Sequence, residues 1–418
     1  MSKTPEVAAI ILAAGKGERM KSSLPKVLHK ICGRPMVMYV FDLIDSLKIK
    51  KNVLVLGYKS EEVRKIVPSG IKTVLQKTLS GTADAVKKAV PVLKGFKGTV
   101  IILYGDNPLL QKETLDKLIK HHQDTRAAVT LLTAKLKKPF GYGRIIRDKY
   151  SSVCGIVEEK DANDYQKDIK EINTGVMCFD AEKLFNSLRL VKPNNRKKEY
   201  YLTDCVEILY SRGEIVEGLE ISDPQEAFGV NTRVELAQGY TIIQGRILEK
   251  YMKDGITIVD PRTTFINFGT EIGQDTVIYP FTVIENDVKI GSSCSVGPFC
   301  HLREGTRLSD EVKVGNFIEI VRSSLSPHTR AKHVGYIGDT VIGGNVNIGA
   351  GTITANYNGK DKNTTIIEDN AFIGSDTVLV APVKIGKGAR TGAGSVVTKN
   401  KNVPAGAVAV GVPARILK

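Results

Sequence analysis

The sequence contains no tryptophan, and aromatic residues make up only 6% of its 418 residues. Nucleic-acid-binding surfaces usually combine clustered basic residues with aromatic side chains that stack on bases. No basic tract of this chain alternates with aromatic residues. We therefore expect that nucleic acid is not among its partners.

Long apolar runs are also missing. No stretch approaches the roughly 20 consecutive apolar residues that a membrane-spanning helix needs. The first residues, MSKTPEV, lead directly into a short apolar run and have no signal-peptide pattern. We expect a cytoplasmic protein with no membrane partner.

Cysteine is scarce and scattered. The six cysteines form no CxxC pair and no Cys/His cluster with zinc-ligand spacing: Cys32, Cys154, Cys178, Cys205, Cys294 and Cys300. Reduced, mostly buried thiols are the expectation, as is usual for cytosolic proteins.

Acidic residues are outnumbered by basic ones. The chain has 60 Lys and Arg against 45 Asp and Glu, which gives a formal net charge of +15 and a pI of about 9.3. This excess is either a solvated basic surface or a set of sites for phosphorylated, anionic ligands.

What the chain does contain is a six-residue rhythm in its last third. Aliphatic residues recur at this interval: Ile272, Ile278, Ile284, Ile290, Val296, Leu302, Leu308, Val314, Ile320, then Ile342, Ile348, then Ile367, Ile373, Leu379, Ile385 and Val397. The length of the series argues against chance recurrence in an aliphatic-rich chain. A period of six matches neither a helix nor an alternating strand. It fits triangular coils in which each short strand points one aliphatic residue to the axis and Gly or Asn takes the corner.

We therefore predict a left-handed parallel β-helix of hexapeptide repeats over residues 255–418, a fold used mostly by acyltransferases. The segment 355–364 (ANYNGKDKNT) interrupts the rhythm and should be a loop extruded from a coil. Residues 231–254 carry apolar positions at helical spacing and are expected to form a linker helix.

Residues 1–230 alternate short aliphatic runs with amphipathic stretches. Strands are expected at 7–14, 52–56 and 99–103, and helices at 35–49, 83–93 and 112–122. This alternation predicts an α/β domain with a Rossmann-like, mostly parallel sheet.

The loop after the first strand, residues 12–26, has the character of a phosphate-binding loop. Gly15 and Gly17 would let backbone amides approach phosphate oxygens, while Arg19 and Lys26 supply positive charge. The loop is neither a Walker A motif nor a GxGxxG fingerprint. On these residues alone, phosphate binding and an ordinary turn remain equally open.

The full string LAAGKGERM followed by LPK resembles the signature of sugar-nucleotide pyrophosphorylases, specifically the UDP-N-acetylglucosamine branch. Further motifs follow in that family's order over residues 5–233: Gln76 with residues 80–82, residues 104–106, residues 141–144, Glu158, Asn173, residues 199–204 and Asn231. The resemblance implies that a sugar 1-phosphate oxygen attacks the α-phosphorus of UTP and that pyrophosphate leaves. No covalent intermediate is needed, so positioning and charge neutralisation would supply the catalysis.

The same resemblance implies a role for each residue. Asp106 and Asn231 would hold a Mg²⁺, Arg19 would neutralise the departing pyrophosphate, and Lys26 the other phosphates. Singly, Asp106 could be a helix N-cap, Asn173 a turn residue and Lys26 a solvated charge. The residues implied to contact UTP or UDP-N-acetylglucosamine are Leu12, Ala13, Ala14, Gly15, Lys26, Gln76, Gly81, Thr82, Tyr104, Gly105, Asp106, Gly143, Glu158, Asn173 and Asn231.

The β-helix resembles the glucosamine-1-phosphate N-acetyltransferase that this family fuses to its pyrophosphorylase. The matching strings are GPFCHLREG, VGNFIEI, KHVGYIGD, NVNIGAGTITANYNGKDK and FIGSDTVLVAPV. His333 would be the base, a role that suits an imidazole titrating near neutrality, and Glu319 would orient it. The resemblance further implies a homotrimer, a glucosamine 1-phosphate site at Arg303, Tyr336, Asn347 and Lys362, and an acetyl-CoA site at Ala350, Asn356, Tyr357, Ser375 and Ala393.

One position departs from the family pattern. Where the family carries a phosphate-binding Lys two residues after the Glu of its GNFxE motif, this chain has Val321, followed by Arg322. Neighbouring strand residues point to opposite faces, so Arg322 should not inherit the role unless the strand bulges. Losing one charge-assisted contact costs roughly 1.5–3 kcal/mol.

The leading hypothesis is a bifunctional enzyme of UDP-N-acetylglucosamine synthesis, which supplies precursors of peptidoglycan, lipopolysaccharide and other surface glycans. Its substrates would be glucosamine 1-phosphate, acetyl-CoA, N-acetylglucosamine 1-phosphate and UTP. A second hypothesis keeps only the uridylyltransferase, with the β-helix as a trimerisation scaffold. A third is a related nucleotidyltransferase with another sugar or base, because pocket shape decides selectivity.

Overall fold

The computed structural model describes residues 6–417 and divides into two compact units, residues 1–242 and 243–418. Helix α8 (Arg233–Lys253) covers the segment expected as a linker, and the boundary between the units falls inside it. None of the helices in the described residues has the length and apolarity needed to cross a membrane. All six cysteines are free thiols, and five of them are buried.

Unit 1 is built on one mixed sheet with the strand order β11-β7-β10-β6-β1-β4-β5. Every neighbouring pair along this order is parallel except the two that involve β10, which runs antiparallel to β6 and β7. The strands are β1 (Val7–Ala13), β4 (Lys51–Leu56), β5 (Lys72–Leu75), β6 (Thr99–Tyr104), β7 (Val129–Lys135), β10 (Glu171–Asp180) and β11 (Val216–Glu220), with a hairpin of β8 (Arg144–Arg147) and β9 (Val153–Val157) beside β10 and a small ribbon of β2 (Lys30–Ile31) and β3 (Arg34–Pro35).

Helices cover both faces of this sheet, which explains why its central strand is apolar throughout. In β1, Ala8, Ile10 and Leu12 pack in one core cluster, and the alternate residues pack in another. The first cluster includes α3 (Thr82–Ala89), α6 (Ala181–Leu188) and α7 (Asp204–Ser211), and the second includes α1 (Met36–Ser46) and α4 (Lys112–Thr125). The remaining short helices are α2 (Ser60–Arg64), α5 (Asp164–Lys167) and the 3-10 turns Glu18–Met20, Lys26–Leu28, Val90–Leu93 and Pro224–Ala227.

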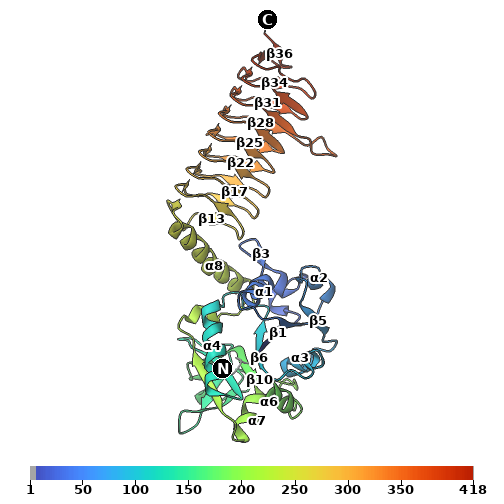
Figure 1. Cartoon of the computed structure of the whole chain (residues 1–418), viewed down its shortest axis with the longest axis vertical. Helices are drawn as coiled ribbons and strands as arrows, with labels where there is room; N and C mark the ends of the chain where they lie inside the picture. Colours follow the sequence, from blue (N-terminus) through green and yellow to red (C-terminus); the bar gives the residue numbers. More distant parts are fainter. Residues whose placement is uncertain (1–5, 418) are drawn as a thin grey trace. The chain divides into compact units, whose positions relative to one another are not determined.

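Unit 2 is a parallel β-helix whose coils present three sheets (Figure 1). The first sheet contains β12 (Thr257–Ile258), β15 (Val277–Ile278), β18 (Ser295–Val296), β21 (Lys313–Val314), β24 (Arg330–Ala331), β27 (Asn347–Ile348), β30 (Phe372–Ile373), β33 (Arg390–Thr391), β35 (Val408–Val410) and β36 (Arg415–Ile416). The second contains β13 (Phe265–Ile266), β16 (Val283–Ile284), β19 (His301–Leu302), β22 (Ile318–Val321), β25 (Gly335–Gly338), β28 (Ile353–Ala355), β31 (Val378–Val380) and β34 (Val396–Val397). The third contains β14 (Glu271–Ile272), β17 (Lys289–Ile290), β20 (Arg307–Leu308), β23 (Ser324–Leu325), β26 (Thr340–Ile342), β29 (Thr365–Ile367) and β32 (Val383–Ile385).

The six-residue rhythm fills the axis of these coils, as predicted. Ile278, Ile284, Val296, Leu302 and Ile320 are fully buried in one core cluster that runs through the unit. The predicted architecture, an α/β domain with a mostly parallel sheet followed by a left-handed β-helix of hexapeptide repeats, is confirmed.

Gly or Asn occupies only part of the corners, among them Gly351, Asn370, Gly394 and Asn400, and other residue types take the rest. Left-handed backbone angles recur every six residues at Asp275, Phe281, Asp287, Ser293, Phe299, Gly305, Glu311 and Phe317. Such strain costs about 1–3 kcal/mol per residue and persists where the surroundings hold the backbone. Here the coils above and below do so, since for example the Phe317 amide donates to the Phe299 carbonyl at 3.0 Å.

The extruded loop lies between β28 and β29, where the repeat breaks. Tyr357 and Lys362 form an isolated antiparallel bridge, so the segment leaves the coil as a small hairpin (Figure 1).

Candidate functional site

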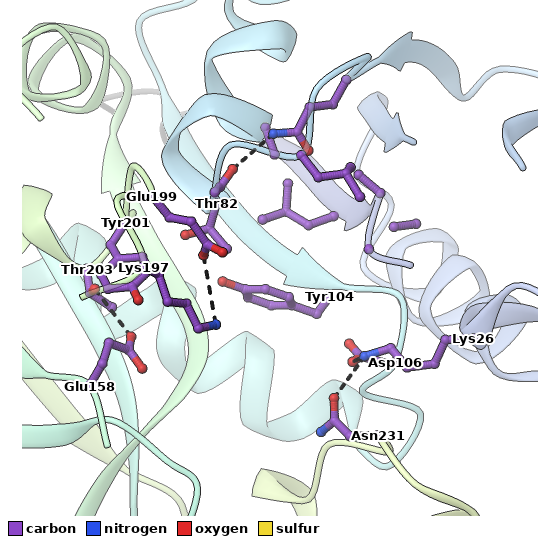
Figure 2. A pocket seen from close by; sticks show the side chains of 18 of the residues that line it. Lys26, Thr82, Tyr104, Asp106, Glu158, Lys197, Glu199, Tyr201, Thr203 and Asn231 are labelled. Atoms are coloured by element: carbon purple, nitrogen blue, oxygen red, sulfur yellow. Dashed lines mark hydrogen bonds and ion pairs between the residues drawn. The ribbon is translucent and has the colours of Figure 1, made fainter. Parts of the chain in front are cut away.

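The candidate site of unit 1 is a cavity of about 440 Å³ at the carboxyl ends of β1 and β6 (Figure 2). Ligands of open α/β sheets bind at such ends because the loops that follow the strands converge there. The lining residues are Leu12, Ala13, Ala14, Gly15, Lys26, Val27, Gln76, Leu79, Gly81, Thr82, Ala85, Tyr104, Asp106, Glu158, Asn173, Lys197, Glu199, Tyr201, Thr203 and Asn231.

The glycine-rich loop is shaped to bring Lys26 into this cavity. Gly17 has a φ of 65°, and a Cβ there would lie 2.7 Å from the Lys26 Cβ. The close approach of the two backbones therefore requires glycine at this position. Arg19, in the 3-10 turn Glu18–Met20, is exposed and is not among the lining residues.

Three polar side chains meet at one end of the cavity. The Lys26 ammonium pairs with Asp106, and it donates to the Asn231 Oδ1 at 2.9 Å. Two hydrogen bonds hold the backbone of Asp106 and Asn231 in place. The Val230 backbone amide donates to the Asp106 carbonyl at 3.0 Å, and the Asn231 backbone amide donates to the Glu235 carboxylate at 2.7 Å. Residues 80 and 205 positions from Lys26 in the sequence thus join it in one cluster.

This cluster fits a divalent cation. The Asp106 carboxylate and the Asn231 amide oxygen both converge on a single cationic group, the Lys26 ammonium. Oxygen donors of this kind suit Mg²⁺, which usually takes one or two protein ligands and completes its shell with water and substrate phosphates. The protein offers no more than that: residues 6–417 contain no group of three or more His, Cys, Asp and Glu side chains placed to hold a metal.

The opposite part of the cavity holds carboxylate, amide and hydroxyl groups. Burial raises the pKa of Glu158, and the Thr203 hydroxyl, 3.4 Å away, and Lys197 oppose that rise. The Asn173 side chain is nearly buried, and the backbone amide of Asn173 donates to the Gly143 carbonyl at 2.9 Å. Gly143 itself is not a lining residue, but a Cβ there would lie 3.5 Å from Glu158.

Gln76 closes a third side of the cavity. It is almost fully buried, and its amide NH₂ donates to the Gly81 carbonyl at 3.0 Å and to Asp84 at 2.9 Å. Gly81 has a φ of 113°, and a Cβ there would meet the Tyr200 carbonyl. This contact brings the Gly81 loop against the segment that carries Tyr201 and Thr203.

Of the residues expected to contact nucleotide or sugar, the cavity brings together all but Gly105 and Gly143. Sequence reasoning did not single out Val27, Leu79, Ala85, Lys197, Glu199, Tyr201 or Thr203. A signal existed for Glu199, Tyr201 and Thr203, which belong to the motif at residues 199–204, although that motif was not assigned residue by residue. Lys197 lies outside the motif, in a turn, and nothing in the sequence marked it.

The candidate site of unit 2 is a groove of about 750 Å³ along the first sheet. It brings together His333, Asn347, Ala350, Ser375 and Ala393, all of which were expected from the sequence. Gly349 and Gly374 allow the coils to pack closely there, since a Cβ at either would lie about 2.5 Å from backbone atoms of the next coil.

His333, the expected base, and Glu319, which was expected to orient it, are not hydrogen-bonded to each other. Glu319 accepts from Arg303 at 2.7 Å, because β19 and β22 are neighbours in the second sheet. In residues 6–417 no side chain hydrogen-bonds the His333 imidazole, which follows β24 in the first sheet. Glu319 therefore orients Arg303 in this structure, and the expectation that it orients His333 is not met.

Three of the other expected residues, Tyr336, Asn356 and Lys362, belong to a second cluster of polar side chains around Asp339. Asp339 accepts two bonds from Arg322, at 2.6 and 2.8 Å, and also pairs with Asn356. The Arg322 bonds are the main reason that the pKa of Asp339 is lowered, and the charge of Lys362 adds to the effect. A Cβ at Gly338 would lie 2.6 Å from the Tyr336 hydroxyl and 2.7 Å from the Asn356 amide, so these two side chains converge as well.

Val321 and Arg322, at the position that departs from the family pattern, lie at the end of β22 and at the corner that follows it. Val321 is the last residue of β22 and is buried, whereas Arg322 stands at the corner with a φ of 45°. Both line a hollow of about 420 Å³ together with Arg303, but the guanidinium of Arg322 is engaged by Asp339. Tyr357 lies in the extruded hairpin, where its hydroxyl donates to the Gly359 carbonyl at 2.6 Å.

Comparisons with known proteins agree with this division. The family described as "MobA-like NTP transferase domain" matches residues 9–164, and "Bacterial transferase hexapeptide (six repeats)" matches residues 269–304 and 364–399. Proteins called "Bifunctional protein GlmU" are similar over nearly the whole chain. That of Geobacillus sp. (strain WCH70) is 43% identical, covering 96% of this chain and 94% of its own; that of Pelotomaculum thermopropionicum is 46% identical, covering 91% and 90%.

The chain belongs to the GlmU family. It is therefore a bifunctional transferase, with a nucleotidyltransferase domain followed by a hexapeptide acetyltransferase domain, as predicted. Full-length similarity to bifunctional GlmU proteins supports this hypothesis over the one in which the β-helix is only a scaffold.

Proposed function

We propose that this GlmU-family protein makes UDP-N-acetylglucosamine in two reactions. Unit 2 would transfer the acetyl group of acetyl-CoA to glucosamine 1-phosphate, and unit 1 would couple the product to UTP with release of pyrophosphate. The observation that carries the first half of this proposal is the meeting of Lys26, Asp106 and Asn231 at one end of a cavity that has Glu158 and Asn173 elsewhere on its wall.

For uridylyl transfer, the residues of unit 1 act by binding and orientation. A bound Mg²⁺ held by Asp106 and Asn231 would supply charge neutralisation at the phosphates. Lys26 sits beside both ligands, so its ammonium can pass from them to the phosphate oxygens of the substrates. Gln76 and Thr82 would face the uracil and ribose, and Glu158 and Asn173 the sugar. Arg19, exposed outside the cavity, would meet only the departing pyrophosphate.

For acetyl transfer, His333 is the proposed base. The amine of glucosamine 1-phosphate attacks the thioester carbonyl of acetyl-CoA, a C–N bond forms, and the C–S bond breaks. His333 takes the proton of the attacking nitrogen and can return it to the departing thiolate of coenzyme A. Ala350, Ser375 and Ala393 leave space in the groove for the pantetheine arm. Arg303, Tyr336, Asn347 and Lys362 would bind the sugar phosphate, with Asn356 and Tyr357 on the acetyl-CoA side.

We further propose that the protein is a cytoplasmic homotrimer in which the extruded hairpin of residues 356–364 reaches a neighbouring chain. Its six free thiols suit a reducing compartment, where UTP and acetyl-CoA are also found.

Two substitutions test the two halves separately. Asp106→Ala should abolish UTP-dependent pyrophosphate release and leave thiol release from acetyl-CoA unchanged. His333→Ala should abolish thiol release from acetyl-CoA and leave UTP-dependent pyrophosphate release unchanged, because the reacting groups belong to different units. Thiol release that persists in His333→Ala would refute its role as base. Pyrophosphate release that persists in Asp106→Ala would refute the proposed metal site.

A further inference from the structure

A single turn aims Lys197 at the uridylyltransferase cavity. The Asn195 side chain closes this turn with two hydrogen bonds: it donates to the Glu199 carbonyl at 2.6 Å and accepts from the Glu199 amide at 3.1 Å. The turn is tied to the sugar side of the cavity, since the Arg196 amide donates to Asp161 at 3.2 Å. Lys198 takes the left-handed conformation, with a φ of 54°, which lets the chain reverse there.

Lys197 is one of the two cationic side chains that line the cavity, and its hydrogen-bonding capacity is largely unused. The other, Lys26, is already engaged by Asp106 and Asn231. In residues 6–417, the ammonium of Lys197 has one ion-pair partner, Glu199, at 4.0 Å. An ammonium carries three donors, so Lys197 can donate to a ligand without giving up a strong contact.

The position of Lys197 indicates which part of a ligand it would meet. Figure 2 shows Lys197 on the side of Glu158, Tyr201 and Thr203, well away from Lys26 and Asp106, with its amine directed into the cavity. Phosphates belong at the end that holds Lys26. The groups left for Lys197 are the oxygen acceptors of the sugar, its hydroxyls and the carbonyl of its acetamido group.

Lys197 also acts on a neighbouring carboxylate. Burial raises the pKa of Glu158, and the charge of Lys197 works against that rise. An ionised Glu158 accepts hydrogen bonds from sugar hydroxyls, whereas a protonated one accepts less well. The titratable and charged groups around Glu158 are Lys197, Asp161, Glu199, Asp204, Tyr104 and Tyr201. Lys197 supplies the positive charge of this group.

We propose that Lys197 is a sugar-recognition residue of the uridylyltransferase site, donating to oxygen acceptors of the sugar 1-phosphate. This inference rests on the proposed uridylyl transfer of unit 1. It assigns a function to a residue that the sequence motifs did not mark.

The test compares Lys197→Gln with Lys198→Gln, measuring pyrophosphate release in the full-length protein with UTP and N-acetylglucosamine 1-phosphate. Both variants lose one positive charge from the same turn, but only Lys197 lines the cavity. In Lys197→Gln the KM for the sugar phosphate should rise roughly tenfold or more, the range for a lost charge-assisted hydrogen bond. The KM for UTP should stay within about twofold, and Lys197→Arg should restore part of the loss. Thiol release from acetyl-CoA in the same preparations reports intact protein.

Two results would overturn the inference while leaving uridylyl transfer intact. One is an unchanged KM for the sugar phosphate in Lys197→Gln. The other is an equal rise in Lys198→Gln, which would mean that only the general charge of the turn matters. A wild-type protein that releases no pyrophosphate from these substrates would instead refute the proposed function of unit 1.

Discussion

At the scale of single residues, the cavity of unit 1 is a place where burial and charge are in conflict. Glu158 lines its sugar side, Asp204 lies close enough for the charge of Glu158 to act on it, and burial is the main cause that raises the pKa of each. Acidic neighbours add to the effect at Asp204, whose pKa rises to about 6. Because an ionised carboxylate is less stable there than in water, this corner costs stability at neutral pH, an arrangement typical of functional sites.

Asp204 gives a pH-dependent prediction. Its pKa is higher in the folded state, about 6, than the usual 3.8, so the folded protein binds the proton more tightly than the unfolded chain. The penalty is full above pH 6, shrinks as the pH falls through 6, and is gone near pH 4. Asp204→Asn should therefore raise the unfolding free energy by roughly 1 kcal/mol at pH 8, allowing for partial exposure, and have no such effect near pH 4.

Chemical denaturation at both pH values measures this difference. Asp164→Asn is the matched control, because Asp164 is also the first residue of a helix but its side chain is fully exposed. A gain in stability that is the same at pH 8 and pH 4 would contradict the electrostatic cause.

At the scale of elements, aromatic side chains at strained corners of the β-helix stack on one another and stabilise it. Phe281, Phe299 and Phe317 occupy the same corner of three successive coils and have left-handed backbone angles. Their rings stack at 4.8 and 5.0 Å, nearly parallel, along the outside of the coils. Stacked aromatic pairs contribute about 0.5–1.5 kcal/mol beyond burial, which offsets part of the backbone strain.

The aromatic ladder predicts unequal effects along its length. Phe299→Ala removes both stacking contacts and Phe281→Ala removes one, at corners of similar conformation. We expect Phe299→Ala to lower the free energy of unfolding by about 1–3 kcal/mol and Phe281→Ala by about half as much. Denaturant unfolding followed by far-ultraviolet circular dichroism compares the two. Equal losses would show that stacking is not what stabilises these corners.

At the scale of the whole molecule, the dominant property is the excess of positive charge. This chain has a formal net charge of +15, and its proposed substrates, UTP, sugar phosphates and acetyl-CoA, are all anions. A field of this sign raises the rate at which anions meet the protein, and salt screens it.

The net charge predicts that salt lowers the rate at which UTP binds the protein and not the rate of the reaction in the bound complex. Between about 10 mM and 0.1 M ionic strength the Debye length falls from about 30 to about 10 Å. Over this range kcat/KM for UTP should fall about threefold or more, while kcat changes little, with the free Mg²⁺ concentration held constant. Sucrose in place of salt is the control. An equal fall in kcat would show that salt acts on the bound complex instead.

The amino-acid sequence by itself determined the architecture and most of the cavity. The six-residue period admits one packing, with aliphatic side chains on the axis of a coil, and Ile278, Leu302 and Ile320 lie there. The apolar central strand required helices on both faces of its sheet. The resemblance to sugar-nucleotide pyrophosphorylases implied thirteen of the residues that line the cavity of unit 1. The loops at the carboxyl ends of the strands bring these residues together.

Only the tertiary structure decided which side chains become partners. Glu319 faces Arg303 because the coils place β19 beside β22, while His333 belongs to another sheet. Arg322 is engaged by Asp339 because the chain turns a corner there, which no strand pattern announces. Lys197 enters the cavity through a turn closed by Asn195. Local sequence sets the direction of a strand or the period of a coil, but contacts between side chains depend on which distant segments the fold brings within a few ångströms.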